Sequence, residues 1–160
     1  MKDGLSAPER GVEDVERFLA NHDIAVRTVP ADTSTALSAA ETLGTEVAAI
    51  VKSLLFIQDA MPILALVSGI RTVNVHRLAV LVGAESVRLA RPREVRSLTG
   101  YAVGGVPPVA HRQPMRVVMD RHLMEFPLVY AAAGSTVAIF EIRPHDLSRI
   151  SGAEVGDFAE

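Results

Sequence analysis

Apolar residues recur every three or four positions in several short stretches of the chain, which is the spacing of one face of an α-helix. Each stretch is bounded by residues that start or end helices: proline at a first helical position, a Ser, Thr or Asn cap, or a terminal glycine. Five helices are predicted from this pattern, over residues 7–21, 36–43, 74–83, 92–100 and 144–150.

Other stretches are apolar or alternate between apolar and polar residues, and Gly, Pro, Asp or Ser bounds them, as expected for β-strands. Residues 49–58 and 63–67 flank a turn at residues 59–62, which predicts an antiparallel hairpin. Further strands are expected over residues 24–29, 86–90, 117–119, 128–132 and 137–142.

Strands and helices do not alternate regularly along the chain, so a doubly wound fold is not expected. The predicted fold class is mixed α/β (α+β): a single domain over residues 1–160 with a mixed, largely antiparallel central sheet flanked by helices. Residues 151–160 follow the last predicted element and are expected to form a frayed tail.

Composition narrows the class of protein. The chain of 160 residues is 49% apolar without an uninterrupted apolar run of about 18 residues, so no membrane partner is expected. The first ten residues carry Asp3, Glu9 and Arg10 where a signal peptide would be apolar, which favours a cytoplasmic location. Cysteine is absent, which excludes disulfides, thiolate catalysis and Cys-ligated zinc.

The net charge of −3 is unevenly distributed along the chain. Residues 61–123 carry nine arginines against three acidic residues, whereas both flanking segments are acidic. The planar guanidinium group matches phosphate oxygens, so this segment is a candidate nucleic-acid surface. A solvated face whose charges interact with the acidic ends is the alternative. The most closely spaced arginines are Arg88, Arg91, Arg93 and Arg96.

A glycine- and proline-rich loop spans residues 100–108. Gly104 and Gly105 permit close backbone approach and unusual dihedral angles, while Pro107 and Pro108 stiffen the exit of the loop. Free N–H groups near the two glycines would form a binding site for an oxyanion or a carbonyl oxygen. A rigid turn between a helix and a strand is the alternative interpretation.

Lys52 is the second candidate, because it interrupts the apolar run of residues 48–56. Lysine is rarely fully buried without a partner. Either Lys52 extends along a strand edge into solvent, or its ammonium group holds a phosphate or a carbonyl in a polar pocket.

The chain lacks other recognisable catalytic motifs. Its histidines show no metal-ligand spacing, although His111 follows the glycine-proline loop closely enough to contact a substrate. No Gly-x-Ser-x-Gly motif, P-loop or dinucleotide-binding fingerprint is present. No metal and no cofactor are therefore expected.

Taken in order, these segments resemble the YbaK/prolyl-tRNA synthetase-associated editing-domain family. The similarity rests on short motifs whose order and spacing extend over most of the chain. They include Ser34-Thr35-Ala36, Val51-Lys52-Ser53-Leu54-Leu55-Phe56, Pro92-Arg93-Glu94-Val95, Leu98-Thr99-Gly100-Tyr101, Gly104 to Pro108, Ala133-Gly134-Ser135 and Asp146-Leu147.

The resemblance implies hydrolysis of the ester that joins an amino acid to the terminal ribose of a tRNA, without metal or covalent intermediate. The expected partners are a mischarged tRNA and an aminoacyl-tRNA synthetase, and the expected state is a monomer or small homo-oligomer. Lys52 and the loop from Gly104 to Pro108 match the family's active site. The implied site comprises Lys52, Gly104 and Gly105 as catalytic residues, with Val106, Pro107, Pro108, Gly134, Ser135 and Thr136 around the substrate. His111 joins the substrate-binding set because it follows the loop closely, and the positive charge of the middle segment predicts that Arg88, Arg91, Arg93 and Arg96 contact the tRNA.

An aminoacyl ester is already reactive, so a positioned water and preorganised donors for the developing oxyanion are sufficient chemistry. This chain departs from the family pattern in having Val109-Ala110 where many members have an aromatic residue and glycine, and Thr136 where some have His. A non-catalytic module that binds tRNA or a synthetase is therefore the alternative. Intact Lys52 and the glycine-proline loop favour the enzyme.

Overall fold

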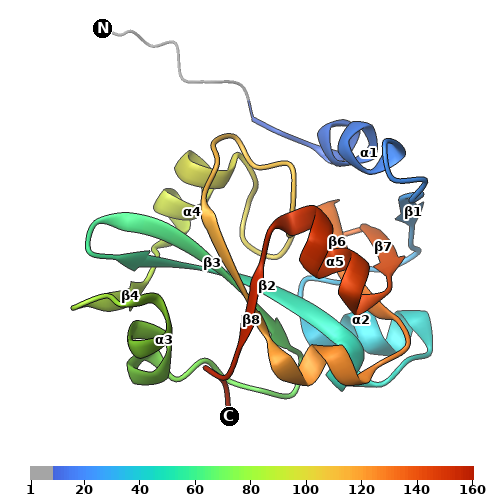
Figure 1. Cartoon of the computed structure of the whole chain (residues 1–160). Helices are drawn as coiled ribbons and strands as arrows, with labels where there is room; N and C mark the ends of the chain where they lie inside the picture. Colours follow the sequence, from blue (N-terminus) through green and yellow to red (C-terminus); the bar gives the residue numbers. More distant parts are fainter. Residues whose placement is uncertain (1–8) are drawn as a thin grey trace, which may run out of the picture.

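Four of the five α-helices begin within one residue of the predicted start, whereas α1 begins at Val12, after Gly11, and not at residue 7; residues 7 and 8 of that predicted helix lie outside the described residues. The computed structural model describes residues 9–160 (Figure 1). Proline is the first residue of two helices, and Thr or Asn side chains cap two others, so local sequence determines where these helices begin. Within the described residues the α-helices are α1 (Val12–Ala20), α2 (Ala36–Leu43), α3 (Val75–Val82), α4 (Pro92–Thr99) and α5 (Pro144–Ser151), with short 3-10 helices η1 (Val47–Ala49) and η2 (Arg121–Glu125).

The strands form one mixed sheet in the order β1-β7-β6-β2-β3-β5-β8, with β4 beside β2. Four of the strand pairs are antiparallel and three are parallel, which confirms the predicted mixed α/β fold with a largely antiparallel sheet. The strands are β1 (Arg27–Thr28), β2 (Ile50–Gln58), β3 (Met61–Ser68), β4 (Val87–Leu89), β5 (Arg116–Asp120), β6 (Val129–Ser135), β7 (Ala138–Ile142) and β8 (Glu154–Gly156).

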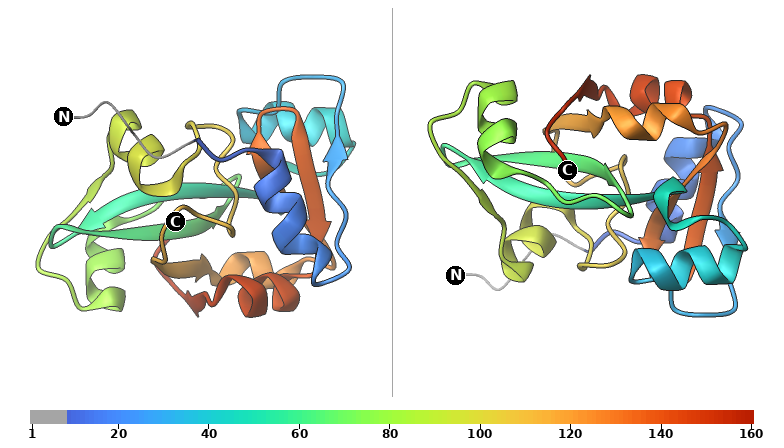
Figure 2. Two further views of the ribbon diagram at one scale, coloured as in Figure 1. Left: turned by 90° about the horizontal axis from the view of Figure 1, so that it is seen from above. Right: turned by 90° about the horizontal axis from the view of Figure 1, so that it is seen from below.

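Helices cover both faces of the sheet. Apolar residues of α1, α4 and α5 pack into the main core on one face, and those of α2 and α3 pack into two smaller clusters on the other. Figure 2 shows α3 and α4 on opposite sides of the β2–β3 hairpin. None of the helices between residues 9 and 160 combines the length and the apolar character that a membrane span requires.

The C-terminal segment corrects one prediction. Residues 151–160 are not frayed: after α5 the chain turns at Gly152 and β8 pairs in parallel with β5. Phe158 is fully buried beside Leu78 of α3, and Thr72 and Glu160 exchange two backbone hydrogen bonds of 2.8 Å. The prediction was wrong because the strand is only three residues long and its pairing partner is distant in sequence.

The edge of β2 that faces away from β3 is covered only at its two ends. β6 pairs with β2 at Ile50 and Val51, and β4 pairs with it from Phe56 to Gln58. Between these contacts, no described strand lies beside residues 52–55, a stretch that we call the open edge. The candidate functional site lies at this gap.

Candidate active site

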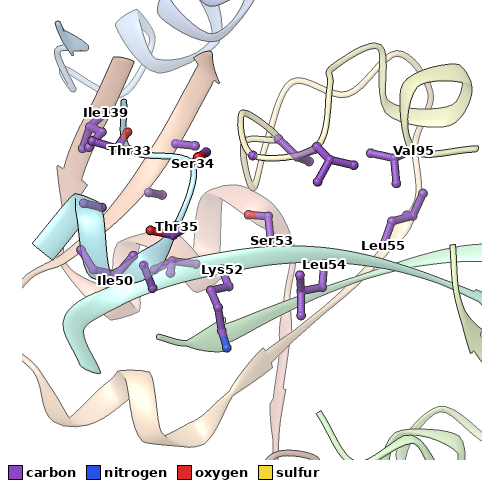
Figure 3. A pocket seen from close by; sticks show the side chains of 18 of the residues that line it. Thr33, Ser34, Thr35, Ile50, Lys52, Ser53, Leu54, Leu55, Val95 and Ile139 are labelled. Carbon is purple, nitrogen blue, oxygen red and sulfur yellow. The ribbon is translucent and has the colours of Figure 1, made fainter. Parts of the chain in front are cut away.

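A cavity of about 460 Å³ lies at the open edge of β2 (Figure 3). The loop into α2 forms one wall, β4 and α4 form another, and the glycine-proline loop and β6 complete it. Most of the lining is apolar, with hydroxyl groups from Thr33, Ser34, Thr35 and Ser53. Among the residues that the structure describes, no Asp or Glu lines this cavity, and Lys52 is the single charged one that does.

Lys52 lines the cavity, but its ammonium group lies on the other side of β2. Successive side chains of a strand alternate between its two faces, and Figure 3 shows Lys52 pointing away from Ser53. The Lys52 Nζ donates a hydrogen bond of 2.6 Å to the Arg71 carbonyl oxygen. Burial lowers the pKa of Lys52, and the negative charge of Asp120 partly opposes this effect.

The turn that contains Arg71, whose carbonyl oxygen accepts the hydrogen bond from Lys52, is anchored to the C-terminal segment. The Arg71 guanidinium pairs with the buried Asp120 carboxylate at 3.2 Å and donates to the Ala159 carbonyl oxygen at 2.7 Å. The carbonyl that Lys52 contacts thus belongs to the protein itself and lies outside the cavity. Direct contact with a substrate requires the ammonium group to leave the Arg71 carbonyl.

The glycine-proline loop offers one donor where two were expected. The Gly105 N–H donates to the Ala102 carbonyl oxygen at 3.0 Å and closes a turn. The Gly104 N–H has no acceptor among the described residues, and Gly104 lines the cavity with a φ of 94°. The Gly105 N–H is therefore not free to act as an oxyanion donor, which corrects that prediction, and of the two amides only that of Gly104 lacks an acceptor among the described residues.

Gly105 serves instead to dock the loop against β6. A Cβ atom on Gly105 would lie 2.9 Å from the Ser135 Cα, so only glycine permits this approach. The Gly134 N–H donates to the Gly105 carbonyl oxygen at 3.0 Å, which fixes the same contact. Gly134 and Ser135 thus contact the loop without lining the cavity themselves, and they help to hold the loop in place.

Thr136 also supports the site from behind. Its carbonyl oxygen accepts hydrogen bonds from both the N–H and the hydroxyl of Thr33, each 2.7 Å long. These bonds fix the loop that leads into α2 and places Ser34 and Thr35 at the cavity. Of the residues predicted to contact substrate, Val106 alone lines the cavity.

His111 is not at this cavity. Its Nε2 is 2.7 Å from the Pro107 carbonyl oxygen, and burial lowers the pKa of the imidazole. His111 and Pro108 line a second hollow beside α1 and α5, while Pro107 lines neither. The sequence placed His111 near the loop correctly, but the chain turns after Pro108 and directs the ring away from the cavity.

The four predicted tRNA-binding arginines are exposed: Arg88 lies on β4, Arg91 immediately precedes α4, and Arg93 and Arg96 lie on α4, all close in sequence to cavity-lining residues. Arg88 forms two hydrogen bonds of 2.8 Å with Glu94, and these hold the pKa of Glu94 at about 2. Arg96 pairs with Glu9 at 2.8 Å. Arg91 and Arg93 form no ion pair with residues 9–160 and are the two available for phosphate.

Sequence reasoning missed Ser53 as a site residue. Its hydroxyl oxygen is buried without a hydrogen-bond partner, and the side chain points toward the cavity (Figure 3). The available signal was a second polar residue beside Lys52 within an apolar strand. Between residues 9 and 160, no group of three or more His, Asp or Glu side chains is arranged to hold a metal ion.

Comparison with known proteins identifies the family. The family model described as "Aminoacyl-tRNA editing domain" matches residues 30–150, a range that contains every cavity-lining residue. The chain belongs to the aminoacyl-tRNA editing-domain family. This confirms the resemblance drawn from the sequence motifs.

Relatives of this editing domain occur inside synthetases and as shorter chains. The chain described here is 42% identical over 81 residues to a proline–tRNA ligase of Nitratidesulfovibrio vulgaris (strain DP4), and the match covers 51% of this chain but only 14% of the ligase. It is 31% identical over 123 residues to the uncharacterized protein YwhH of Bacillus subtilis (strain 168), covering 76% of this chain and 78% of YwhH.

A solved structure matches the editing domain over nearly its whole length. It is a crystal structure described as that of a candidate trans-editing enzyme for prolyl-tRNA synthetase. The TM-score is 0.87 and the sequence identity is 40%, with 93% of this chain and 96% of the other covered. Family and fold together support a deacylase type of function.

Proposed function

We propose that this chain is a trans-acting aminoacyl-tRNA deacylase, which hydrolyses the ester of a mischarged tRNA and so proofreads translation. The observation that carries the proposal is the cavity at the open edge of β2, which brings the Gly104 amide and an apolar wall together in a chain of the editing-domain family. Two relatives are covered over 78% and 96% of their own length, which supports action separate from a synthetase.

In the proposed reaction, water attacks the ester carbonyl carbon and the carbonyl oxygen becomes an oxyanion. The Gly104 N–H, which lacks an acceptor among the described residues, stabilises that charge. The carbon–oxygen bond to the ribose then breaks, and the ribose oxygen leaves with a proton. A neighbouring ribose hydroxyl group helps to activate the water, so no acid–base pair is required of the protein.

The cavity wall restricts the amino acid. Its apolar surface includes Ile50, Val51, Leu55, Val95 and Val106, and none of the residues from 9 to 160 places a carboxylate in the lining to pair with a cationic side chain. Burying an unpaired charge is costly. We therefore expect an uncharged, predominantly apolar amino acid to be removed, with cavity size excluding larger residues as a sieve.

The exposed arginines at β4 and α4 are proposed to hold the acceptor end of the tRNA. Arg91 and Arg93 are available without breaking an ion pair to a described residue. Arg88 and Arg96 must first exchange Glu94 and Glu9 for phosphate. The affinity for tRNA is therefore expected to depend more on Arg91 and Arg93 than on Arg88 and Arg96.

The deciding experiment incubates the purified chain with a panel of mischarged tRNAs and follows release of each amino acid under single-turnover conditions. Faster release of at least one apolar amino acid than in buffer is expected. Release at the uncatalysed rate for every member of the panel, by a protein that is folded according to circular dichroism, would refute the deacylase.

A non-catalytic tRNA-binding or synthetase-binding module is the second candidate. The observation in its favour is that the Lys52 ammonium group already bonds to the Arg71 carbonyl oxygen and not to a group in the cavity. This candidate predicts salt-sensitive tRNA binding without release of any amino acid. The same panel, combined with an equilibrium binding assay, separates the two candidates.

A further inference from the structure

The main chain of the open edge presents unpaired polar groups to the cavity. The Ile50 carbonyl oxygen accepts from Gly69 on the β3 side, whereas the Leu55 carbonyl oxygen accepts from Ala90 on the opposite side. Because successive residues of a strand direct their N–H and C=O groups to alternate edges, those of Ser53 point to the same side as those of Leu55. On that side β6 pairs only as far as Val51, and β4 begins at Phe56. The Ser53 N–H and C=O groups therefore lack a strand partner.

The Ser53 side chain adds a third polar group at the same place. Its Oγ is buried and has no hydrogen-bond partner. A buried hydroxyl without a partner is costly, so such groups are uncommon in folded proteins. On the adjacent strand, the buried Ser68 hydroxyl donates to the Ala48 carbonyl oxygen at 2.7 Å. The packing of this sheet thus gives the buried Ser68 hydroxyl an acceptor and leaves the buried hydroxyl oxygen of the half-buried Ser53, beside the cavity, without a partner.

We propose that the open edge of β2 binds the main-chain part of the aminoacyl group, with Ser53 pairing to it as one strand residue pairs to another. The substrate's α-ammonium group donates to the Ser53 carbonyl oxygen and, after rotation of the side chain, to Ser53 Oγ. The substrate's ester carbonyl oxygen accepts from the Ser53 N–H. This inference rests on the proposed function, because the aminoacyl ester is the ligand.

Charge supports this assignment of groups. An α-ammonium group inside the cavity finds no carboxylate among the lining residues, so neutral oxygen atoms must receive its protons. Strand-like pairing at an exposed sheet edge is a general way to bind an extended main chain through hydrogen bonds that do not depend on the identity of its side chain. The substrate class is thereby narrowed to esters with a free α-amino group, and N-acylated or peptidyl esters are excluded.

The test uses hydrolysis-resistant amides, so that it does not depend on turnover. The probe is 3′-(L-alanylamido)-3′-deoxyadenosine, because alanine minimises contacts with the apolar wall. Two comparison ligands are used: the propionyl amide, which lacks the amino group, and the N-acetylalanyl amide, in which the amino group is acylated. Wild-type protein is expected to bind the alanyl amide at least tenfold more tightly than either comparison ligand. Ser53→Ala should weaken the alanyl amide about tenfold and the propionyl amide less than twofold.

Ser68→Ala is the matched control, because it removes a buried serine hydroxyl from the neighbouring strand without touching the cavity lining. It should leave the preference for the amino group unchanged. In NMR titrations, the amide signals of Ser53 and Leu55 should shift with the alanyl probe. Equal wild-type affinity for the alanyl and propionyl amides, or an equal loss for both in Ser53→Ala, would overturn the proposal.

Failure of the inference and failure of the proposed function are distinguishable. Deacylation of mischarged tRNA without any preference for the amino group would reject the role of Ser53 and retain the deacylase. Amino-dependent binding of the amide without deacylation of any tRNA would reject the deacylase and retain the binding edge.

Discussion

Ser68 and Ser53, on neighbouring strands, each have a buried hydroxyl oxygen but differ in its hydrogen bonding. Ser68 Oγ donates to a carbonyl oxygen, whereas Ser53 Oγ has no partner. Removal of a buried hydrogen bond typically costs about 1 kcal/mol, while removal of an unsatisfied polar group costs little or stabilises. A buried hydroxyl group that lowers the stability of the fold, as that of Ser53 should, is therefore a candidate for a functional role.

This contrast predicts opposite effects on stability. Ser68→Ala should lower the free energy of unfolding by about 1 kcal/mol, and Ser53→Ala should leave it unchanged or raise it slightly. Denaturant unfolding followed by circular dichroism measures both variants. A clear loss of stability in Ser53→Ala would mean that its hydroxyl has a structural partner after all.

Lys52 allows a second residue-scale prediction. Lys52→Met retains the apolar part of the side chain and removes the ammonium group that contacts the Arg71 carbonyl oxygen. If the ammonium group also acts on the substrate, single-turnover deacylation should fall at least tenfold, which corresponds to ~1.4 kcal/mol of transition-state stabilisation. A folded Lys52→Met protein with wild-type rate would restrict the lysine to anchoring the turn after β3.

At the scale of elements, the sequence predicted best what is determined locally. The caps at Thr35 and Asn74 and the prolines that open α4 and α5 fixed the starts of four helices. The hairpin was located correctly, but its turn comprises only residues 59–60, because residues 61–62 of the predicted turn already pair with β2. The strand predicted over residues 24–29 is reduced to Arg27 and Thr28, which pair with β7, and beyond them only the Val29 N–H continues the pairing, with the Val137 carbonyl oxygen.

Pairing between distant elements was not predictable. The parallel contact of β2 with β6 creates the open edge by ending at Val51, and no signal near Ser53 reveals where that contact stops. The docking of Gly105 on Ser135 likewise joins residues thirty positions apart. The sequence therefore located the loop and Lys52 but misassigned the Gly105 amide and missed Ser53.

The glycine-proline loop gives an element-scale prediction. Gly104→Ala and Gly44→Ala each place a side chain at a positive φ, with values of 94° and 70°, and each should cost about 1–2 kcal/mol of stability. Only Gly104 lines the cavity, and a Cβ atom there would lie 3.1 Å from the Ser34 Cβ. Alanine keeps the backbone N–H, but this Cβ atom should displace the amide from its position toward the oxyanion, and full loss of one oxyanion donor typically lowers the rate ~100-fold or more.

Deacylation should therefore fall at least tenfold in Gly104→Ala and remain near wild type in Gly44→Ala. Single-turnover rates measured below the unfolding transition of both variants make the comparison. Similar rates in the two variants would remove the Gly104 amide from the mechanism. Gly105→Ala is unsuitable for this purpose, because its Cβ would strike the main chain of Ser135 and displace the loop.

At the scale of the whole molecule, the proposed chemistry makes no use of a metal ion. The predicted outcome is that deacylation persists in excess EDTA, since the ester is activated by hydrogen bonds to the oxyanion. Activity assays before and after chelation, followed by addition of zinc or magnesium, provide the measurement. Activity that is lost on chelation and restored by either ion would contradict this mechanism.

Charge is also distributed at this scale, because the arginine-rich middle segment supplies the surface beside the cavity while acidic residues dominate both ends of the chain. Each phosphate contact releases counterions, so the logarithm of tRNA affinity should fall linearly with the logarithm of salt concentration. Arg91→Gln and Arg93→Gln should each flatten that slope by about 0.7–0.9, the value for one lost phosphate contact.

Arg88→Gln should flatten the slope less, because Glu94 competes with phosphate for its guanidinium group. Arg149→Gln is the matched control: this arginine is also exposed and pairs with Asp146, but α5 contributes no residue to the cavity. Affinities measured over a range of salt concentrations give the four slopes. If Arg149→Gln flattens the slope as much as Arg91→Gln and Arg93→Gln do, the positive surface attracts tRNA diffusely and does not position its acceptor end at the cavity.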